Sequence, residues 1–346
     1  MSIIGNIGGQ SGGGSLTKSV LIIAAPTGST VTVTKGGATK TATEKNGEWW
    51  FKNLENGEWT IRAELDGQNA TEVFNITQFG VYRRSISYRM TPEFTYTGDY
   101  EIVQDDDTPI EDFASWKGNW KIRFLTSDDF AFTKMHEFSG KIDVFLVGGG
   151  GGGGNGNNSA GGGGGGGYTK TQKNVTTVVN TNYSIVIGGG GSAGNNGNSG
   201  GATSAFSITA PGGKGGEGIG YSESTYNLNG GDGGSGGAGY TAGHGGTNGS
   251  NGASRPGVTD NFAGNGGKGQ GTTTREFGED TGKLYSGGGS GGGVTTTADE
   301  TSGAPSVTPP DNRGGGGGGS SHGGKNNATN GASGIVIIRN ARGVAQ

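Results

Sequence analysis

The sequence contains no cysteine, which excludes disulfide bonds and thiolate metal sites. It has no run of about 18 apolar residues, so we expect no membrane-spanning helix and no membrane insertion. Met1 to Gly5 lacks the basic and apolar regions of a secretory signal, which predicts synthesis in the cytoplasm without a signal peptide. The formal net charge is only −4, with Lys and Arg scattered along the chain. A nucleic-acid-binding protein would normally carry a basic stripe, so we expect no nucleic-acid partner.

Proline is scarce, with 8 residues, whereas glycine accounts for 83 of the 346 residues. Residues 1–147 hold 16 glycines and all five tryptophans, and residues 148–346 hold the other 67 glycines. The first part can build ordinary β cores. The second part has too few large apolar side chains to bury a core of its own size.

Residues 16–91 predict a small β-sandwich that follows a flexible Gly/Ser leader over residues 1–15. Thr30 to Thr34 alternates with a period of two residues, as in a half-buried strand. Asn46-Gly47 and Asn56-Gly57 are strong hairpin signals between apolar segments. Short strands with turn signals every 8–12 residues are typical of a sandwich. The pattern does not say whether this module attaches to another protein or binds a ligand.

Residues 92–346 predict one glycine-rich domain with a β base. The base is expected from strands within 92–147, 174–209 and 334–339, and residues 148–333 are expected to form the glycine-rich bundle with its loops. Strands are expected at 94–103, 120–126, 129–133, 141–147, 174–179, 183–187 and 202–209. The apolar strand 334–339 needs a pairing partner near 94–147 or 183–187. That pairing would make the whole glycine-rich region one long insertion between two strands of the β base.

Within the glycine-rich region, glycine recurs at every third position in short blocks, such as Gly194, Gly197 and Gly200. Three residues per turn is the period of the polyproline II helix, and the broken register and few prolines exclude collagen. We therefore predict an all-β fold with essentially no α-helix, in which the β base carries a bundle of polyglycine II helices. A disordered tract is the alternative, since the composition is low in hydrophobic residues.

No motif in the chain predicts catalysis, a cofactor or a metal site. The G-x-G-x-x-G patterns carry little information where one residue in three is glycine, and no Walker sequence is present. His136, His244 and His322 share no ligand spacing. The acidic loop Asp105 to Asp107 is either simply solvated or, with a carbonyl, a calcium ligand.

Interruptions between the glycine blocks are the candidate binding surfaces. If the blocks are parallel rods, residues 221–229, 255–262, 272–286 and 294–313 are loops at the rod ends, where a rigid scaffold usually presents binding residues. Alternatively, these loops only plug the ends of the bundle. Aromatic and Arg side chains suit anchor roles, which nominates six residues: Tyr221, Tyr226, Phe262, Arg275, Phe277 and Tyr285.

Several features follow one another in a fixed order in the second part of the chain. They are the strand Asp143 to Val147 that runs into a glycine block, Gly167-Tyr168-Thr169, the strand that runs into glycine over residues 183–191, Gly200-Gly201-Ala202-Thr203-Ser204, and the terminal Gly334-Ile335-Val336-Ile337-Ile338-Arg339. This order resembles the glycine-rich domain of phage tail proteins. The glycine blocks with variable loops also resemble the polyglycine II sandwich adhesins at phage tail-fibre tips, over residues 92–340.

The resemblance implies a virion tail or tail-fibre protein that binds the host cell surface through the loops between glycine blocks, without catalysis. The partners it implies are a host surface glycan or protein and other phage tail proteins, and the chain could form a homo-oligomer. A structural tail component, in which the bundle is a rigid spacer, is the alternative. A free ice- or surface-binding protein is a third option, but the threonines cluster in loops rather than along the rods.

Overall fold

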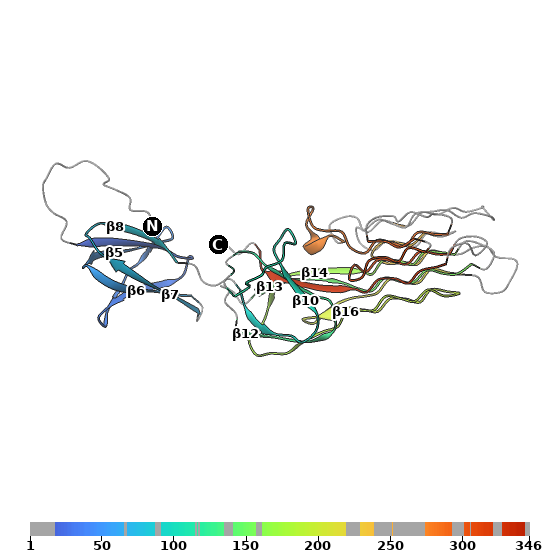
Figure 1. Ribbon diagram of the computed structural model, residues 1–346, viewed down its shortest axis with the longest axis horizontal. Coiled ribbons are helices and arrows are strands. Elements are labelled where there is room, and N and C mark those ends of the chain that lie inside the picture. Colours follow the sequence, from blue (N-terminus) through green and yellow to red (C-terminus); the bar gives the residue numbers. More distant parts are fainter. Residues whose placement is uncertain are drawn as a thin grey trace.

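The computed structural model describes residues 18–65, 68–86, 91–114, 116, 118–134, 141–156, 161–218, 229–238, 251, 274–292, 301–304, 306–320 and 327–342. The fold is all-β: these residues form strands, extended glycine runs and one short 3-10 segment, η1 (Glu276–Gly278) (Figure 1). No helix within the described ranges is long and apolar enough to cross a membrane.

The N-terminal part is a sandwich of two four-stranded sheets. One sheet has the order β4-β5-β1-β8, from β1 (Ser19–Ala24), β4 (Glu44–Lys45), β5 (Glu48–Leu54) and β8 (Val81–Ser85). The other has the order β3-β2-β6-β7, from β2 (Thr30–Lys35), β3 (Ala38–Thr41), β6 (Gly57–Leu65) and β7 (Gln68–Ile76).

Period-two alternation directs the apolar side chains of the sandwich inward. Val31 and Val33 of β2 are buried, whereas the threonines between them face outward. The core also holds Trp49 and Trp59. Asn46 and Gly47 both have positive φ, 54° and 75°, as the hairpin signal between β4 and β5 requires. The sandwich predicted from the sequence is therefore present.

The β base consists of two sheets and a hairpin. A five-stranded sheet has the order β10-β11-β18-β13-β14, from β10 (Tyr100–Val103), β11 (Lys121–Phe124), β13 (Lys141–Val147), β14 (Thr169–Thr176) and β18 (Ile335–Asn340). A three-stranded sheet has the order β15-β12-β9, from β9 (Glu93–Thr95), β12 (Asp128–Lys134) and β15 (Tyr183–Ile185). Strands β16 (Thr203–Ala205) and β17 (Ile208–Ala210) form the hairpin. A buried aromatic and aliphatic cluster lies between these layers.

The C-terminal strand β18 closes the β base, as predicted. It pairs antiparallel with β11 on one side and β13 on the other, so that Val336 lies opposite both Phe124 and Leu146. All six residues of β18 are buried. The two ends of the glycine-rich region are therefore neighbouring strands of one sheet.

Three strand predictions differ from the structure. The expected strand 94–103 is divided into β9 and β10, which belong to different sheets, and the expected strand 174–179 lies earlier, as β14. The expected strand 202–209 turns back on itself at Phe206 and Ser207, which have φ of 51° and 62°. Phe206 is not a typical turn residue and rarely adopts a positive φ, so the alternation gave no sign of this hairpin.

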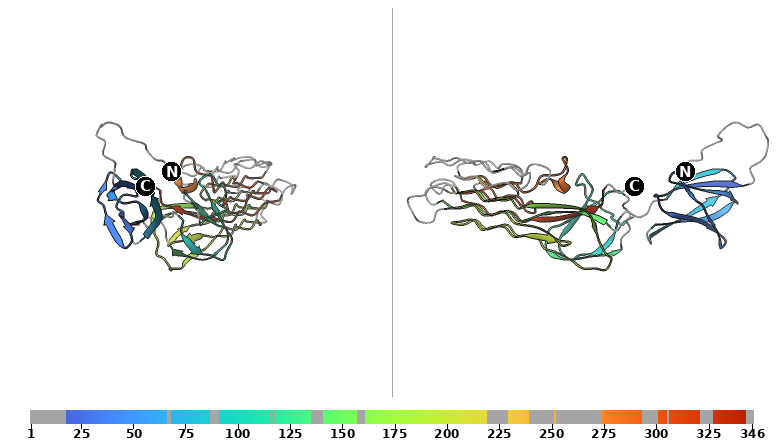
Figure 2. Two further views of the ribbon diagram at one scale, coloured as in Figure 1. Left: turned by 60° about the vertical axis from the view of Figure 1, so that its left-hand side comes forward. Right: turned by 180° about the vertical axis from the view of Figure 1, so that it is seen from behind.

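The glycine-rich chain runs back and forth beside itself, away from the five-stranded sheet (Figures 1 and 2). Runs 148–154 and 161–168 each donate their N–H groups to three neighbouring runs in turn. In the run 148–154, Gly148, Gly151 and Gly154 donate to run 161–168, Gly149 and Gly152 donate to run 198–201, and Gly150 and Gly153 donate to run 329–332, over N–O distances of 2.8–3.0 Å. The hydrogen bonds to any one neighbour thus recur every three residues.

The run 161–168 lies at the centre of this arrangement, which we call the glycine bundle. Its N–H groups donate to runs 211–217, 235–238 and 314–320. Its carbonyl groups accept from runs 148–154, 231–234 and 289–292. Six runs therefore surround it, and its backbone groups bond to the backbone of these runs, except that the carbonyl of Gly167 accepts from Oγ of Ser286.

Backbone contacts exclude side chains from the interior of the glycine bundle. A Cβ atom placed on Gly151 would lie 2.0 Å from the carbonyl oxygen of Lys214, and one on Gly164 would lie 2.1 Å from that of Gly151. Neither glycine has a positive φ, so the requirement comes from this close approach rather than from backbone conformation. Glycine is therefore needed here because the carbonyls of adjacent runs occupy the space of a side chain.

Two adjacent glycines provide a direct test of this packing. A Cβ on Gly190 would lie 1.9 Å from the carbonyl oxygen of Gly331, whereas a Cβ on Gly189 would meet nothing within 4 Å. We expect Gly190→Ala to lower the free energy of unfolding by about 3 kcal/mol or more. Gly189→Ala should be neutral or slightly stabilising. Thermal and denaturant unfolding of both variants would measure the difference, and equal melting temperatures would contradict the packing.

Candidate functional site

The glycine bundle gathers several chain segments at its end away from the five-stranded sheet, which we call the distal end. Residues Gly154, Glu217, Ala238, Gly292 and Ser320 are all bonded to residues 161–163 at the start of the central run. Each of these five lies at or near the end of a described run: the segments that follow, 157–160, 219–228, 239–250, 293–300 and 321–326, lie outside the described residues. Five described runs therefore end at the distal end, and a connecting segment begins after each of them.

Two of the six predicted anchors belong to a segment tethered at the distal end on both sides. Glu217 donates its N–H to the carbonyl of Asn229, so segment 219–228 starts and finishes there. Tyr221 and Tyr226 lie within it, and Phe262 lies between residues 251 and 274; all three are outside the described residues. The structure thus fixes both ends of the segment that contains Tyr221 and Tyr226 at the distal end.

The other three predicted anchors lie at the opposite end, against the β base. Phe277 and Tyr285 are 2% and 1% exposed. Their rings pack on Phe145 of β13, with centroid distances of 5.9 Å and 5.3 Å. Arg275 donates from its guanidinium to the carbonyl of Gly282, within the same segment.

This placement corrects the expectation that Phe277 and Tyr285 are exposed anchors on a replaceable loop. They complete a buried cluster with Val147, Ile335 and Ile337. The sequence carried a signal for this role: β13 and β18 are continuous apolar runs, which is typical of strands buried on both faces. The second face needed a cover, and residues 274–286 supply it.

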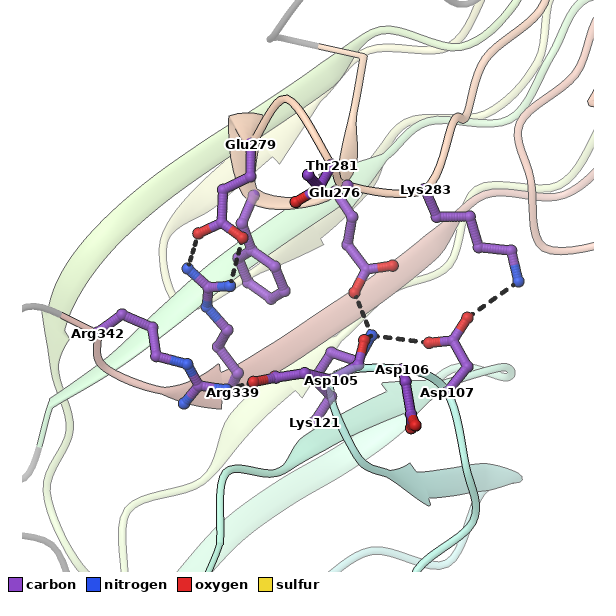
Figure 3. A pocket seen from close by; sticks show the side chains of 12 residues that line it. Asp105, Asp106, Asp107, Lys121, Glu276, Glu279, Thr281, Lys283, Arg339 and Arg342 are labelled. Carbon is purple, nitrogen blue, oxygen red and sulfur yellow. Dashed lines mark hydrogen bonds and ion pairs between the residues drawn. The ribbon is translucent and has the colours of Figure 1, made fainter.

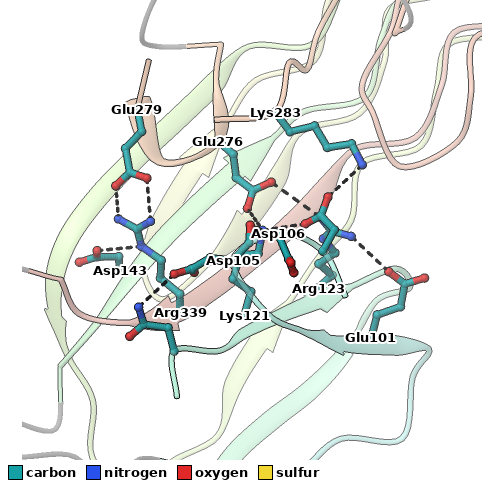
Figure 4. Close-up of polar contacts among 12 residues, drawn as sticks. Glu101, Asp105, Asp106, Lys121, Arg123, Asp143, Glu276, Glu279, Lys283 and Arg339 are labelled. Carbon is teal, nitrogen blue, oxygen red and sulfur yellow. Dashed lines mark hydrogen bonds and ion pairs between the residues drawn. The ribbon is translucent and has the colours of Figure 1, made fainter. Parts of the chain in front are cut away.

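A cluster of buried charges holds residues 274–286 to the sheet (Figure 4). Lys121 of β11 contacts Asp107 at 2.7 Å and Glu276 at 2.8 Å. The side chains of Lys121 and Glu276 are only 5% and 4% exposed. Arg123 also binds Asp107, and Lys283 reaches the same carboxylate at 3.1 Å. We call this group the ion-pair latch.

A second set of charges joins the same segment to the C-terminal strand. Arg339 of β18 contacts buried Asp143 at 3.1 Å and donates to both carboxylate oxygens of Glu279. Its guanidinium also lies 4.0 Å from the centroid of the Phe277 ring. One arginine therefore binds the sheet, the acidic side chain and the aromatic ring together.

These contacts shift the pKa values of acidic side chains in and beside the latch. Burial alone would raise the pKa of Asp107, but Arg123 and Lys121 outweigh it and hold that pKa well below its usual value. The hydrogen bond from Arg339 lowers the pKa of Glu279. Burial, together with the charge of Glu276, raises the pKa of the Tyr285 phenol far above its usual value. Asp107 and Glu279 are therefore held as carboxylates.

A cleft of about 540 Å³ lies beside the latch, between the loop Asp105 to Asp107 and residues 276–283 (Figure 3). Two of the acidic side chains that line it are engaged in ion pairs: Asp105 contacts Arg342 at 2.6 Å, and Asp107 binds three cations. Asp106 accepts a hydrogen bond from the N–H of Thr108. Asp105 and Asp107 are thus ion-pair partners of the base, and Asp107 is not free as a calcium ligand. In the described part of the chain no group of three or more His, Asp or Glu residues could hold a metal, and the three histidines lie outside it.

Removing one member of the latch should destabilise the protein. We expect Lys121→Met to cost about 3–5 kcal/mol in the free energy of unfolding, because it leaves Glu276 buried without its main partner. The control is Lys134→Met, which breaks the exposed Lys134–Glu93 pair and should cost less than about 1 kcal/mol. Denaturant unfolding and proteolysis of residues 274–286 would measure both. Equal losses would contradict a structural role for the latch.

The latch should also weaken at low pH. Because the pKa of Asp107 is lowered on folding, its stabilisation is complete above the ordinary carboxyl pKa of 3.8 and declines as the pH falls below it. Asp107→Asn removes the negative charge without straining the backbone, because asparagine tolerates the φ of 71° at this position. We expect the variant to be less stable than the parent at pH 7, with a difference that shrinks below about pH 4. A difference that stays constant with pH would contradict this.

Comparison with known proteins identifies a family for this chain but finds no matching curated protein. No curated protein matches the chain. Among solved structures, a DUF3823 family protein from Bacteroides ovatus matches with 10% sequence identity and a TM-score of 0.19, over 57% of this chain and 96% of that protein. This score carries no argument about fold. The model of the glycine-rich domain family matches residues 126–341, which include β12 to β18 and the glycine bundle. The chain therefore belongs to the glycine-rich domain family.

Proposed function

We propose that this chain is a bacteriophage tail or tail-fibre protein that binds the host cell surface with the distal end of its glycine bundle. The observation that carries the proposal is that five runs, each followed by a connecting segment, end together there. A rigid scaffold that presents several loops at one end is the usual construction of a binding surface. The ligand is a glycan or protein of the host surface, and the protein performs no catalysis.

We further infer that the runs of the bundle are polyglycine II helices. The support is the hydrogen-bond pattern, in which runs 148–154 and 161–168 each donate to three neighbours with a period of three residues. The lack of room for a Cβ atom beside neighbouring carbonyl oxygens supports the same inference. Such helices have no side chains to reposition, so the bundle holds its loops on a stiff frame.

Tyr221 and Tyr226 are the anchors that this arrangement favours. Along the runs, exposed positions carry mainly glycine, asparagine and serine, which offer little contact area. Large aromatic side chains supply most of the binding energy at interfaces, and they also stack on sugar rings. Both tyrosines belong to a segment whose two ends are fixed at the distal end. Phe277 and Tyr285, in contrast, stabilise the base.

A structural role in the tail is the second candidate. Its specific support is the attachment of the bundle to the β base through β18, the buried rings of residues 274–286 and the ion-pair latch. These contacts make the domain a stiff element that other tail proteins, or further copies of this chain, could use as a spacer. In that case the distal segments would not need to bind a host.

Replacement of a distal segment separates the two candidates. We expect a variant with residues 219–228 replaced by Gly and Ser of equal length to fold like the parent and to lose most of its attachment to host cells. The matched control is Val178→Ser with Val179→Ser, which removes two valines that are 59% and 38% exposed on the β base. This control should attach normally. Cell binding of the labelled proteins would be the measurement.

The opposite results favour the structural role. If the 219–228 variant attaches as well as the parent, and a variant with residues 255–262 replaced does the same, the host-binding proposal is wrong. If the control loses attachment while it remains folded, the binding surface lies on the β base instead of the distal end.

A further inference from the structure

The two outer faces of the N-terminal sandwich have different chemistry. The face of the sheet β3-β2-β6-β7 is polar except for Val73, with threonines paired across strands with charged or polar residues, as in Thr32 opposite Arg62. The outer face of the sheet β4-β5-β1-β8 is apolar at its centre. Its members, from the strand alternation and register, are Val20, Ile22, Ala24, Trp50 and Val81. An exposed apolar face on one side of a sandwich points to a binding surface.

Trp50 is the principal exposed side chain of this apolar face. It is 42% exposed, while Ile22, directly opposite it on β1, is only 2% exposed. On the other side of Ile22 the register places Arg83 of β8. Ile22 faces outward and is nevertheless buried, so side chains from the neighbouring strands must cover it. The Trp50 indole is the largest exposed apolar group on this face.

Polar contacts hold the indole in this position. Trp50 donates from Nε1 to Oε2 of Glu48 at 3.1 Å, and Arg83 binds the other oxygen of the same carboxylate. The ring is thus fixed before any ligand binds, which reduces the entropy lost on binding. A carboxylate and a guanidinium lie directly beside it and can exchange hydrogen bonds with sugar hydroxyls. We call this group the Trp50 platform.

The dimensions of the sheet favour a small ligand. The longest strand of the face, β5, has 7 residues, or about 23 Å, and four strands span about 15 Å between the outer two. The available area is roughly 350 Å², whereas a stable protein interface buries about 800 Å² on each partner. One or two sugar rings fit such an area, but a folded protein partner does not gain enough contact from it.

The charge of the face favours an acidic ligand. Lys45 lies directly opposite Glu48, and Lys52 lies two residues beyond Trp50 on the same side of β5. With Arg83, these side chains give the outer face three cations against one carboxylate, although the formal net charge of the whole chain is −4. A local positive field on an acidic protein raises the affinity for anions near that face.

We propose that the Trp50 platform binds an acidic glycan, with a pyranose ring stacked on the indole and the carboxylates of the glycan directed to Lys45, Lys52 and Arg83. This site is independent of the glycine bundle and assigns a ligand to the N-terminal sandwich. A single aromatic platform with exposed charges predicts a dissociation constant in the millimolar range, about −4 kcal/mol. Several copies on one particle would raise the overall avidity.

The test uses the full chain and two matched sugars, trigalacturonate and its methyl ester, which lacks the charges. We expect trigalacturonate to shift the Trp50 indole N–H resonance in a saturable way, with the ester binding at least threefold more weakly. Trp50→Ala should reduce the affinity at least tenfold, and Lys52→Met about threefold. Val73→Ala removes an exposed apolar side chain from β7 in the other sheet and serves as the control, with no expected change.

The variants distinguish this proposal from the one for the bundle. The 219–228 replacement should leave the Trp50 resonance shift intact, even if attachment to host cells is lost. Unchanged melting temperatures would confirm that Trp50→Ala is folded. Absence of a saturable shift up to 20 mM sugar, equal binding of the ester, or full affinity in folded Trp50→Ala would each overturn the acidic-glycan site.

Discussion

The structure of the glycine-rich domain depends on one constraint: in runs 148–154 and 161–168, backbone N–H groups bond to a different neighbouring run at each residue, and to the same run at every third residue. This pattern needs runs so close that a Cβ would lie about 2 Å from a carbonyl oxygen. The constraint accounts for the glycine content directly. It also explains why the region needs no apolar interior, because hydrogen bonds satisfy the backbone from all sides.

The same constraint makes the β base necessary. Ordering a glycine costs roughly 0.5–1 kcal/mol more than ordering an alanine, and a hydrogen bond returns about 1 kcal/mol net. The hydrogen bonds of the bundle therefore contribute little net free energy of folding. The apolar sheet that joins the two ends of the bundle contributes the remaining stability. Burial of β13 and β18 on both faces, completed by Phe277 and Tyr285, provides that support. The ion-pair latch fixes the covering segment to the sheet.

Much of this fold is predictable from the sequence, because local patterns determine it. Alternation predicts the sandwich, and the apolar run Ile335 to Ile338 predicts the closing strand. The latch is not predictable, since it joins Lys121 to Glu276 across 155 positions and only the folded topology brings them together. The same reason explains the error at Phe277 and Tyr285: an aromatic in a polar, glycine-rich segment looks exposed until the uncovered face of the sheet is known. For Tyr221 and Tyr226, the three-residue period predicts a rod end but not what the tyrosines contact.

Hydrogen exchange of the central run 161–168 tests the account most directly. Its eight amides donate to the carbonyls of three surrounding runs, and no side-chain core protects them. The account predicts that all eight exchange slowly and together, with a protection that matches the free energy of global unfolding. Rapid exchange of these amides in the intact protein, at the rate of an unstructured glycine peptide, would contradict the hydrogen-bonded bundle.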